Sequence, residues 1–237
     1  MNKYGLIGKK LGHSLSKKIH EDFFKQKGIN ASYDLLEVSE EEIEETLNLV
    51  KTNYYKGLNV TVPYKETVIK YLDELTVAAK EIKAVNTIYL KDGKLIGDNT
   101  DYLGFIKQLE DNNINVENKD VYVLGSGGAS KAIIYALKIL KANPIVVSRN
   151  PEKGISYEML AQIENISLII NTTPVGMYPN INDEVLDKEI IERTECCIDL
   201  IYNPKQTIFL KYSKRGFNGF EMLINQALEA ERLWGNN

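Results

Sequence analysis

The segment DVYVLGSGGASKAIIYALKI, residues 120–139, restricts the possible folds more than any other part of the chain. An apolar run typical of a buried strand passes through glycines into a helical pattern. Gly125 and Gly127 match the first two positions of the G-x-G-x-x-G/A dinucleotide fingerprint, and Ser130 occupies the third. Gly125 permits the tight turn, and the following glycines let backbone N–H groups approach a pyrophosphate. The segment therefore predicts a dinucleotide site, although an ordinary strand-to-helix turn or the nucleoside site of a methyltransferase uses similar residues.

Strand and helix patterns alternate along the whole chain. Before residue 100, strand patterns cover 3–8, 31–38 and 57–62, helical patterns cover 16–28, 39–51 and 65–82, and residues 84–99 form a hairpin-like pair. Ser39 and Glu42 have capping-box spacing at the start of the second helix, and Asp92-Gly93 is typical of the hairpin turn. After residue 115, strand patterns cover 120–125, 144–149, 168–173 and 196–202, with helical patterns over 129–141 and 222–234.

This order predicts an α/β protein of two domains, with largely parallel sheets and a cleft between the domains. We expect residues 1–100, joined by a C-terminal helix over 219–237, to form a substrate-binding domain. Residues 101–218 are expected to form a Rossmann-like, doubly wound dinucleotide-binding domain. The segment between the strands at 144–149 and 168–173 is short for a crossover helix with two loops, so that helix is predicted to be truncated or replaced by a loop.

Composition and charge exclude several other classes. A net charge of −4 gives no overall field that favours nucleic acid or an anionic membrane, and no apolar run is long enough for a signal peptide or a membrane span. The adjacent Cys196 and Cys197 lie in a strand pattern and are expected to be buried thiols, which favours the cytoplasm. His13 and His20 have no metal-ligand spacing, so no metal is expected; His13 is predicted to line the cleft and His20 to lie on a helix surface.

The residues after the second strand of the dinucleotide unit indicate which cofactor binds. An NAD site offers an acidic side chain to the ribose there, whereas this chain has Ser148, Arg149 and Asn150, followed by Lys153. A cation with a planar donor fork suits a 2′-phosphate, so the sequence favours NADP over NAD. The alternative is that Arg149 is an ordinary exposed arginine.

A group of polar residues occupies predicted strand ends, where open α/β sheets bind ligands. They are Ser14, Ser16, Asn59, Thr61, Lys65, Asn86 and Asp101. Taken singly, each has an ordinary explanation as a helix cap or a turn residue. Lys65 follows VTVP and is either a solvated residue at the start of a helix or a cation directed into the cleft.

Taken together, several short motifs resemble the shikimate dehydrogenase family in order and spacing. They are HSLSKKIH, NVTVPYKE, AVNT, GDNTDYLG, GSGGASKA, NTTPVGM, IDLIYNP and GFEMLINQA, which span nearly the whole chain. NVTVPYK is the most specific of them. The resemblance implies reduction of 3-dehydroshikimate to shikimate by NADPH.

The resemblance also implies roles for individual residues. Lys65 and Asp101 match the catalytic pair. The substrate carboxylate would lie near Ser14 and Ser16, and its hydroxyls near Asn59, Thr61, Asn86, Asp101, Tyr202 and Gln226. The cofactor NADP(H) would contact Gly125, Ser126, Gly127, Gly128, Ala129, Ser148, Arg149, Asn150, Lys153, Thr172 and Gly219, with Met222 beside the nicotinamide. One departure is SRNPEK in place of the usual NRT..R run, which weakens the expected preference for NADP.

Lys65 suits the chemistry of ketone reduction. Negative charge develops on the ketone oxygen as hydride arrives at carbon, and an ammonium held there stabilises that charge and donates a proton, with Asp101 orienting it. Two alternatives stay open: a quinate/shikimate dehydrogenase that uses NAD or both cofactors, and a non-catalytic sensor of a dinucleotide and a small acid. The expected partners are small molecules only, with the chain as a monomer or a homodimer.

Overall fold

The computed structural model describes residues 1–236, which form two compact units. The first unit consists of Met1–Gly104 and the C-terminal segment from Leu223, and the second consists of Phe105–Met222. The boundaries fall inside helices α4 (Asp101–Asp111) and α9 (Phe220–Leu233). In the described part of the chain, no helix is both long and apolar enough to cross a bilayer.

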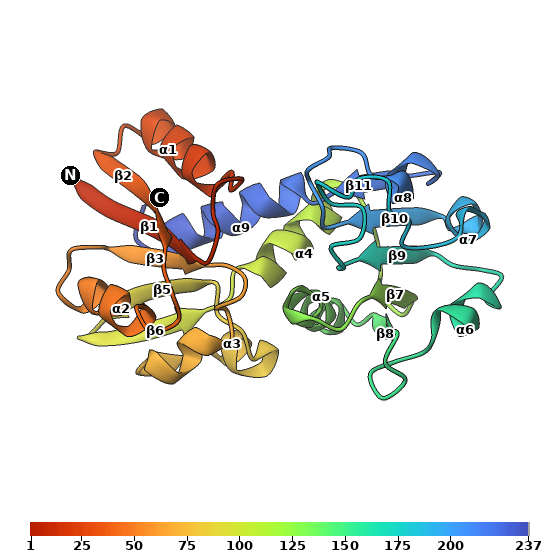
Figure 1. The fold of residues 1–237 in the computed structure, drawn as a ribbon, viewed down its shortest axis with the longest axis horizontal. Helices are drawn as coiled ribbons and strands as arrows, with labels where there is room; N and C mark the ends of the chain where they lie inside the picture. Colours follow the sequence, from red (N-terminus) through yellow and green to blue (C-terminus); the bar gives the residue numbers. More distant parts are fainter. Residues whose placement is uncertain (237) are drawn as a thin grey trace. The chain divides into compact units, whose positions relative to one another are not determined.

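The first unit has a six-stranded mixed sheet of order β2-β1-β3-β5-β6-β4 (Figure 1). The strands are β1 (Asn2–Gly8), β2 (Ala31–Glu37), β3 (Gly57–Val60), β4 (Glu74–Leu75), β5 (Thr87–Lys91) and β6 (Lys94–Asp98). Strand β1 pairs in parallel with β2 and β3, and β5 pairs antiparallel with β3 and β6. Asp92 and Gly93 join β5 to β6 with φ of 51° and 76°, which confirms the predicted hairpin turn.

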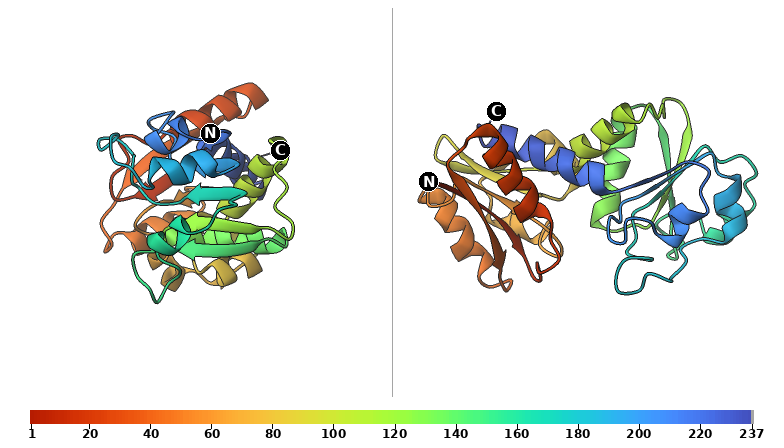
Figure 2. Two further views of the ribbon diagram at one scale, coloured as in Figure 1. Left: turned by 90° about the vertical axis from the view of Figure 1, so that its right-hand side faces the viewer. Right: turned by 90° about the horizontal axis from the view of Figure 1, so that it is seen from above.

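Helices cover both faces of this sheet because the strands bury side chains on both sides. Tyr4 and Leu6 of β1 pack in one cluster with Phe24 of α1 (Ser16–Lys27), and Trp234 packs against the same cluster. Figures 1 and 2 show α1 and the end of α9 beside each other there. Ile7 packs in a second cluster with residues of α2 (Ile43–Lys51), the 3-10 helix η1 (Thr67–Tyr71) and α3 (Val77–Ile82).

Two predicted helices of this unit are wrong in extent. The helix expected over 65–82 is interrupted, because Glu74 and Leu75 pair with β6 and the Asp73 carboxylate accepts the Leu95 N–H at 2.8 Å. These long-range contacts override the local period. The helix expected from residue 39 begins at Ile43, although the predicted hydrogen bond from Ser39 N to the Glu42 carboxylate is present at 2.7 Å.

The second unit has a five-stranded parallel sheet of order β11-β10-β9-β7-β8 (Figure 1). The strands are β7 (Asp120–Leu124), β8 (Asn143–Val147), β9 (Leu168–Asn171), β10 (Cys196–Asp199) and β11 (Gly216–Asn218). The helices are α5 (Gly128–Ile139), α6 (Tyr157–Ala161), α7 (Lys188–Arg193) and α8 (Ile208–Lys211). Helix α6 has only five residues, which confirms the predicted truncated crossover. Cys196 and Cys197 are buried free thiols, as predicted, and burial raises the pKa of Cys197 to about 12.

The sheet order of the second unit places the glycine turn at a topological switch point. Strand β7 has β8 on one side and β9 on the other, so the connections from β7 and from β8 run in opposite directions across the sheet. Ligands of open α/β sheets bind at the carboxyl ends of the strands at such a point.

Candidate functional site

Lys65 and Asp101 form the central ion pair of the first unit. Lys65 Nζ donates to Asp101 Oδ2 at 2.7 Å, and the two side chains are 21% and 13% exposed. Lys65 lies in the loop between β3 and η1, and its carbonyl accepts the Val85 N–H at 2.8 Å. The lysine is thus not a solvated residue at the start of a helix, because η1 begins two residues later and the ammonium is held against a partly buried carboxylate.

Asn86 holds the other oxygen of the same carboxylate. Asn86 Nδ2 donates to Asp101 Oδ1 at 2.9 Å and lies 3.1 Å from Gln226 Oε1 of α9. Its Oδ1 accepts the Thr100 N–H at 2.7 Å. With Asn86 only 2% exposed, this network fixes the Asp101 carboxylate from the side opposite Lys65.

Asn59 extends the network to β2. Asn59 Nδ2 donates to Asn86 O and Thr87 Oγ1, both at 3.1 Å, and Asn59 Oδ1 accepts the Tyr33 hydroxyl at 2.7 Å. Tyr33, Thr87 and Thr100 are fully buried members that the sequence analysis missed. Tyr33 lies in an ordinary strand pattern, so no sequence signal marked it. Thr87 and Thr100 lie within the motifs AVNT and GDNTDYLG, which were the signal that could have found them.

The prediction that His20 lies on a helix surface is wrong. His20 is 1% exposed, its Nδ1 is hydrogen-bonded to the Glu231 carboxylate of α9, and its ring stacks on Tyr33 with centroids 4.2 Å apart. Burial and the charge of Glu231 raise the pKa of Tyr33 well above its usual value. The helical period alone did not reveal this contact, because α9 lies more than 200 residues away in the sequence. His13 is exposed.

Of the remaining predicted substrate residues of the first unit, Ser14 and Thr61 lie in loops and Ser16 is the first residue of α1. Ser14 Oγ accepts the Ser16 N–H at 3.2 Å, so Ser14 supports the start of α1. Thr61 follows β3, is half-buried, and donates its N–H to Ile7 O at 2.9 Å. Tyr202 belongs to the second unit, where burial raises its pKa.

The glycine turn of the second unit combines a residue of positive φ with open space at the start of α5. Gly125 has φ of +99°, and a Cβ there would lie 2.9 Å from Thr173 Cγ2. A Cβ on Gly127 would meet nothing within 4 Å, and no side chain caps the 12-residue helix α5 that begins at Gly128. The open backbone N–H groups and the positive end of the helix dipole fit a pyrophosphate. The predicted cofactor residues of this turn, Ser126, Gly127, Gly128 and Ala129, are all at least partly exposed.

Two further predicted cofactor residues pack against the backbone near this turn. Thr172 Oγ1 donates to Leu124 O, next to Gly125, at 2.6 Å. Gly219 approaches the chain after β10 so closely that a Cβ would lie 2.0 Å from Leu200 O. Met222 is half-buried at the last position of the second unit.

The turn after β8 carries the predicted cations. Arg149 and Lys153 are both exposed. Ser148 Oγ accepts the Asn150 N–H at 3.1 Å, and Asn150 Oδ1 accepts the Glu152 N–H at 3.0 Å. These bonds shape a tight turn that leaves both cations in solvent, where an anion can reach them.

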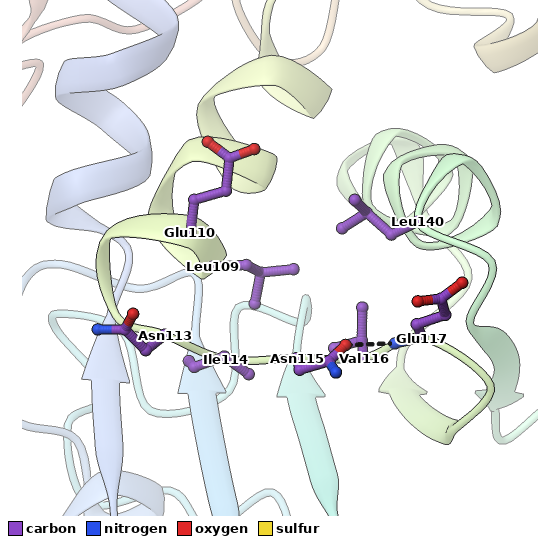
Figure 3. Close-up of a pocket in the computed structure, with 8 residues that line it drawn as sticks. All are labelled: Leu109, Glu110, Asn113, Ile114, Asn115, Val116, Glu117 and Leu140. Atoms are coloured by element: carbon purple, nitrogen blue, oxygen red, sulfur yellow. Dashed lines mark hydrogen bonds between the residues drawn. The ribbon is translucent and has the colours of Figure 1, made fainter.

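A hollow of about 400 Å³ lies elsewhere in the second unit (Figure 3). Leu109, Val116 and Leu140 face one another in it, and Glu110 and Glu117 flank them. It is bordered by the loop before β7 and the end of α5, at the edge of the sheet opposite the glycine turn, so it does not belong to the switch-point site. Among residues 1–236, no group of three or more His, Cys, Asp or Glu side chains could hold a metal ion.

Comparison with known proteins identifies the family to which the chain is similar. Residues 6–88 match the family model described as the shikimate dehydrogenase substrate binding domain. A curated relative from Clostridium beijerinckii, "Shikimate dehydrogenase (NADP(+))", is 43% identical over 249 residues, which is 99% of this chain and 92% of the relative.

Two solved structures are similar over the whole chain. A chorismate mutase/shikimate 5-dehydrogenase fusion protein from Clostridium acetobutylicum is 41% identical, with a TM-score of 0.95, over 100% of this chain and 92% of that one. A shikimate 5-dehydrogenase from Thermus thermophilus, in complex with NADP(H) and shikimate, is 29% identical, with a TM-score of 0.90, over 100% and 94%.

Proposed function

The chain belongs to the shikimate dehydrogenase family, and from that premise we propose that it reduces 3-dehydroshikimate reversibly to shikimate with NADPH, with Lys65 as the proton donor and acceptor and Asp101 orienting it. This reaction is a step of the shikimate pathway, which leads through chorismate to the aromatic amino acids. The single observation that carries the assignment of residues is the 2.7 Å contact between Lys65 Nζ and Asp101 Oδ2 in a partly buried site.

The ion pair suits the charge that develops during ketone reduction. NADPH, when bound, supplies a hydride to the ketone carbon. The Lys65 ammonium stabilises the negative charge on the ketone oxygen and donates the proton that this oxygen acquires. Asp101 keeps the ammonium in place through Oδ2, while Asn86 holds Oδ1. In the reverse direction, the neutral Lys65 amine accepts the proton of the shikimate hydroxyl, and Asp101 again orients it.

The resemblance to the family supports an assignment of residues to the groups of the substrate. Ser14 and Ser16 are proposed to bind the carboxylate, and Thr61, Asp101 and Tyr202 the hydroxyls. Asn59, Asn86 and Gln226 are proposed as further contacts to the hydroxyls. These three are each less than 9% exposed, and their amide groups already bond within the protein. Their larger effect is therefore to hold Asp101 and the loops around it.

The second unit is proposed to bind NADP(H). The open backbone of the glycine turn supports a pyrophosphate site, and the exposed Arg149 and Lys153 support recognition of a 2′-phosphate. Ser148, Asn150, Thr172, Gly219 and Met222 are proposed to contact the remainder of the cofactor. We assign the first unit, Met1–Gly104 with the segment from Leu223, to substrate binding and the second unit, Phe105–Met222, to the cofactor. We propose that the chain works in the cytoplasm as a monomer or a homodimer.

An absorbance assay tests this function and its alternatives together. Purified protein is mixed with 3-dehydroshikimate and either NADPH or NADH, and loss of the reduced nicotinamide is followed by its near-ultraviolet absorbance. We expect fast oxidation of NADPH and a much lower kcat/KM with NADH. In the reverse direction, shikimate and NADP⁺ react, and quinate reacts poorly or not at all. Binding of NADPH without oxidation by 3-dehydroshikimate would contradict the proposal and favour a non-catalytic sensor.

A further inference from the structure

Asp199 is a buried carboxylate that has no part in the proton transfer described above. It ends β10 and is 0% exposed. Its Oδ1 accepts Asn171 Nδ2 and the Ile201 N–H, both at 3.0 Å, and its Oδ2 accepts the Thr207 hydroxyl at 2.6 Å. One side chain thus connects three segments: the end of β9, the turn after β10 and the start of α8.

The bond to Asn171 continues to the glycine turn. Asn171 Oδ1 accepts both the N–H and the hydroxyl of Thr173, at 3.0 and 2.7 Å, which fixes the turn after β9. In that turn, Thr172 Oγ1 donates to Leu124 O at 2.6 Å. Thr173 Cγ2 would lie only 2.9 Å from a Cβ on Gly125. The turn after β9 therefore packs against the glycine turn, and Asp199 fixes the turn after β9 through its hydrogen bond with Asn171.

The other two bonds fix the turn that follows β10. Ile201 donates its N–H to Asp199, and its own carbonyl accepts the Gly219 N–H at 3.2 Å. Thr207 caps α8, because its Oγ1 also accepts the Leu210 N–H at 3.3 Å. The carboxylate thereby determines the position of the segment between Leu200 and Thr207 along the same edge of the sheet.

We propose that Asp199 is a positioning residue for cofactor binding, and that its buried carboxylate preforms the carboxyl edge of the second unit around the glycine turn. The inference rests on the proposed function, in which that turn binds NADP(H). An ionised carboxylate forms stronger hydrogen bonds than a neutral acceptor, and it can accept from several donors at once. Those properties suit a group that must hold three backbone segments in one arrangement.

The cost of this arrangement supports a role beyond simple packing. Burial raises the pKa of Asp199 to about 6, against the opposing effect of its three hydrogen bonds. The protein therefore carries a buried charge at neutral pH whose bonds go to neutral donors. A preformed ligand site accounts for such a group, because rigid walls reduce the ordering that the ligand must impose when it binds.

The test measures NADPH affinity in the full chain, by titration of NADPH fluorescence, alongside kcat and the KM for 3-dehydroshikimate at saturating NADPH. Asp199→Ala removes every acceptor, and Asp199→Asn keeps one oxygen for Asn171 and Ile201. We expect the Kd for NADPH to rise at least 10-fold in Asp199→Ala and at most 3-fold in Asp199→Asn. The KM for 3-dehydroshikimate is expected to stay within 2-fold in both variants.

A matched pair of threonine variants keeps the test decisive if Asp199→Ala does not fold. Thr207→Val removes the hydroxyl that bonds the carboxylate, and is expected to raise the Kd for NADPH about 3-fold. Thr194→Val removes an equally buried hydroxyl bond, to Ile190 O at 2.8 Å, just before the opposite end of β10. It is expected to lower stability but leave the Kd unchanged.

The outcomes separate this inference from the proposed function. Equal NADPH affinity in Asp199→Ala and wild type would overturn the inference. An equal rise in the Kd for NADPH in Thr207→Val and Thr194→Val would also overturn it. Asp199→Asn binding as weakly as Asp199→Ala would also overturn it. Wild-type protein that does not bind NADPH at all would overturn the proposed function, and the inference with it.

Discussion

Asp101 presents its two carboxylate oxygens to different donors, Lys65 to one and Asn86 to the other. This division lets the carboxylate orient the ammonium while remaining anchored to the buried network of the first unit. Removing either donor would free one oxygen and weaken that orientation. Asp199 in the second unit follows the same principle with neutral donors only among its three bonds.

The pKa of Asp199 predicts a pH dependence of stability. Burial raises the pKa to about 6 in the folded protein, from an unfolded value of about 3.9. The folded state therefore binds the proton more tightly, so this contribution is greatest below about pH 4 and is lost as the pH rises through 6. The loss amounts to about 3 kcal/mol.

Denaturation by urea at several pH values between 4 and 7 checks this prediction. Asp199→Asn cannot ionise at this position, so its free energy of unfolding should fall less than that of the wild type over the same range. Parallel pH curves for the two proteins would show that Asp199 is ionised throughout and that its environment is more polar than the burial indicates.

At the scale of elements, the sequence predicted those features that local chemistry determines. Asp92-Gly93 requires positive φ, Gly28 ends α1 in the left-handed region, and the spacing after Arg149 leaves no room for a full crossover helix. It missed features that depend on distant partners. Residues 65–82 have a helical period, but Glu74 and Leu75 in the middle of that segment form strand β4 because they pair with β6.

The candidate site likewise contains residues that local motifs predict and residues that only distant contacts bring together. Lys65 and the glycine turn follow from motifs, because their chemistry needs particular residue types at a fixed spacing. Tyr33, His20 and Glu231 come together only when α1, β2 and α9 pack, so their contact is encoded across the whole fold.

Gly125 and Gly127, in the turn before α5, should respond differently to substitution by alanine. Gly125→Ala introduces a Cβ at φ of +99° and within 2.9 Å of Thr173 Cγ2, so it should lower stability by about 1–3 kcal/mol. Gly127→Ala meets open space at φ of −85°, so it should leave stability nearly unchanged and raise the KM for NADPH at least 10-fold. Thermal unfolding and steady-state kinetics of both variants check this. Unchanged NADPH kinetics in Gly127→Ala would argue against a pyrophosphate at this turn.

The stability of the protein should depend on the buried carboxylate of Glu231 in helix α9. Glu231 is 1% exposed and bonded to His20, so Glu231→Ala leaves a buried imidazole nitrogen without its partner and should cost about 1–3 kcal/mol. Glu229 on the same helix pairs with Arg232 near the surface, and Glu229→Ala should cost less than about 1 kcal/mol. Chemical denaturation compares the two. Equal losses would mean that the buried pair contributes no more than the surface pair.

At the scale of the whole molecule, the chain has two units, each with its own sheet and apolar core. The first holds the Lys65–Asp101 pair, and the second holds the glycine turn and its neighbouring cations. The similarity to shikimate dehydrogenases extends over 99% of the chain, so it includes both units. A net charge of −4 gives no general attraction for an anionic substrate or cofactor, so the local cations must provide it.

The most direct measurement of the central claim is the turnover of Lys65→Met with NADPH and 3-dehydroshikimate. Loss of the ammonium should lower kcat by about 10²–10⁴-fold, while the Kd for NADPH stays within 3-fold because the glycine turn is unchanged. Lys70→Met, at an exposed lysine of η1, should keep wild-type turnover. If Lys65→Met turns over at a near-wild-type rate, Lys65 does not transfer the proton and the proposed mechanism is wrong.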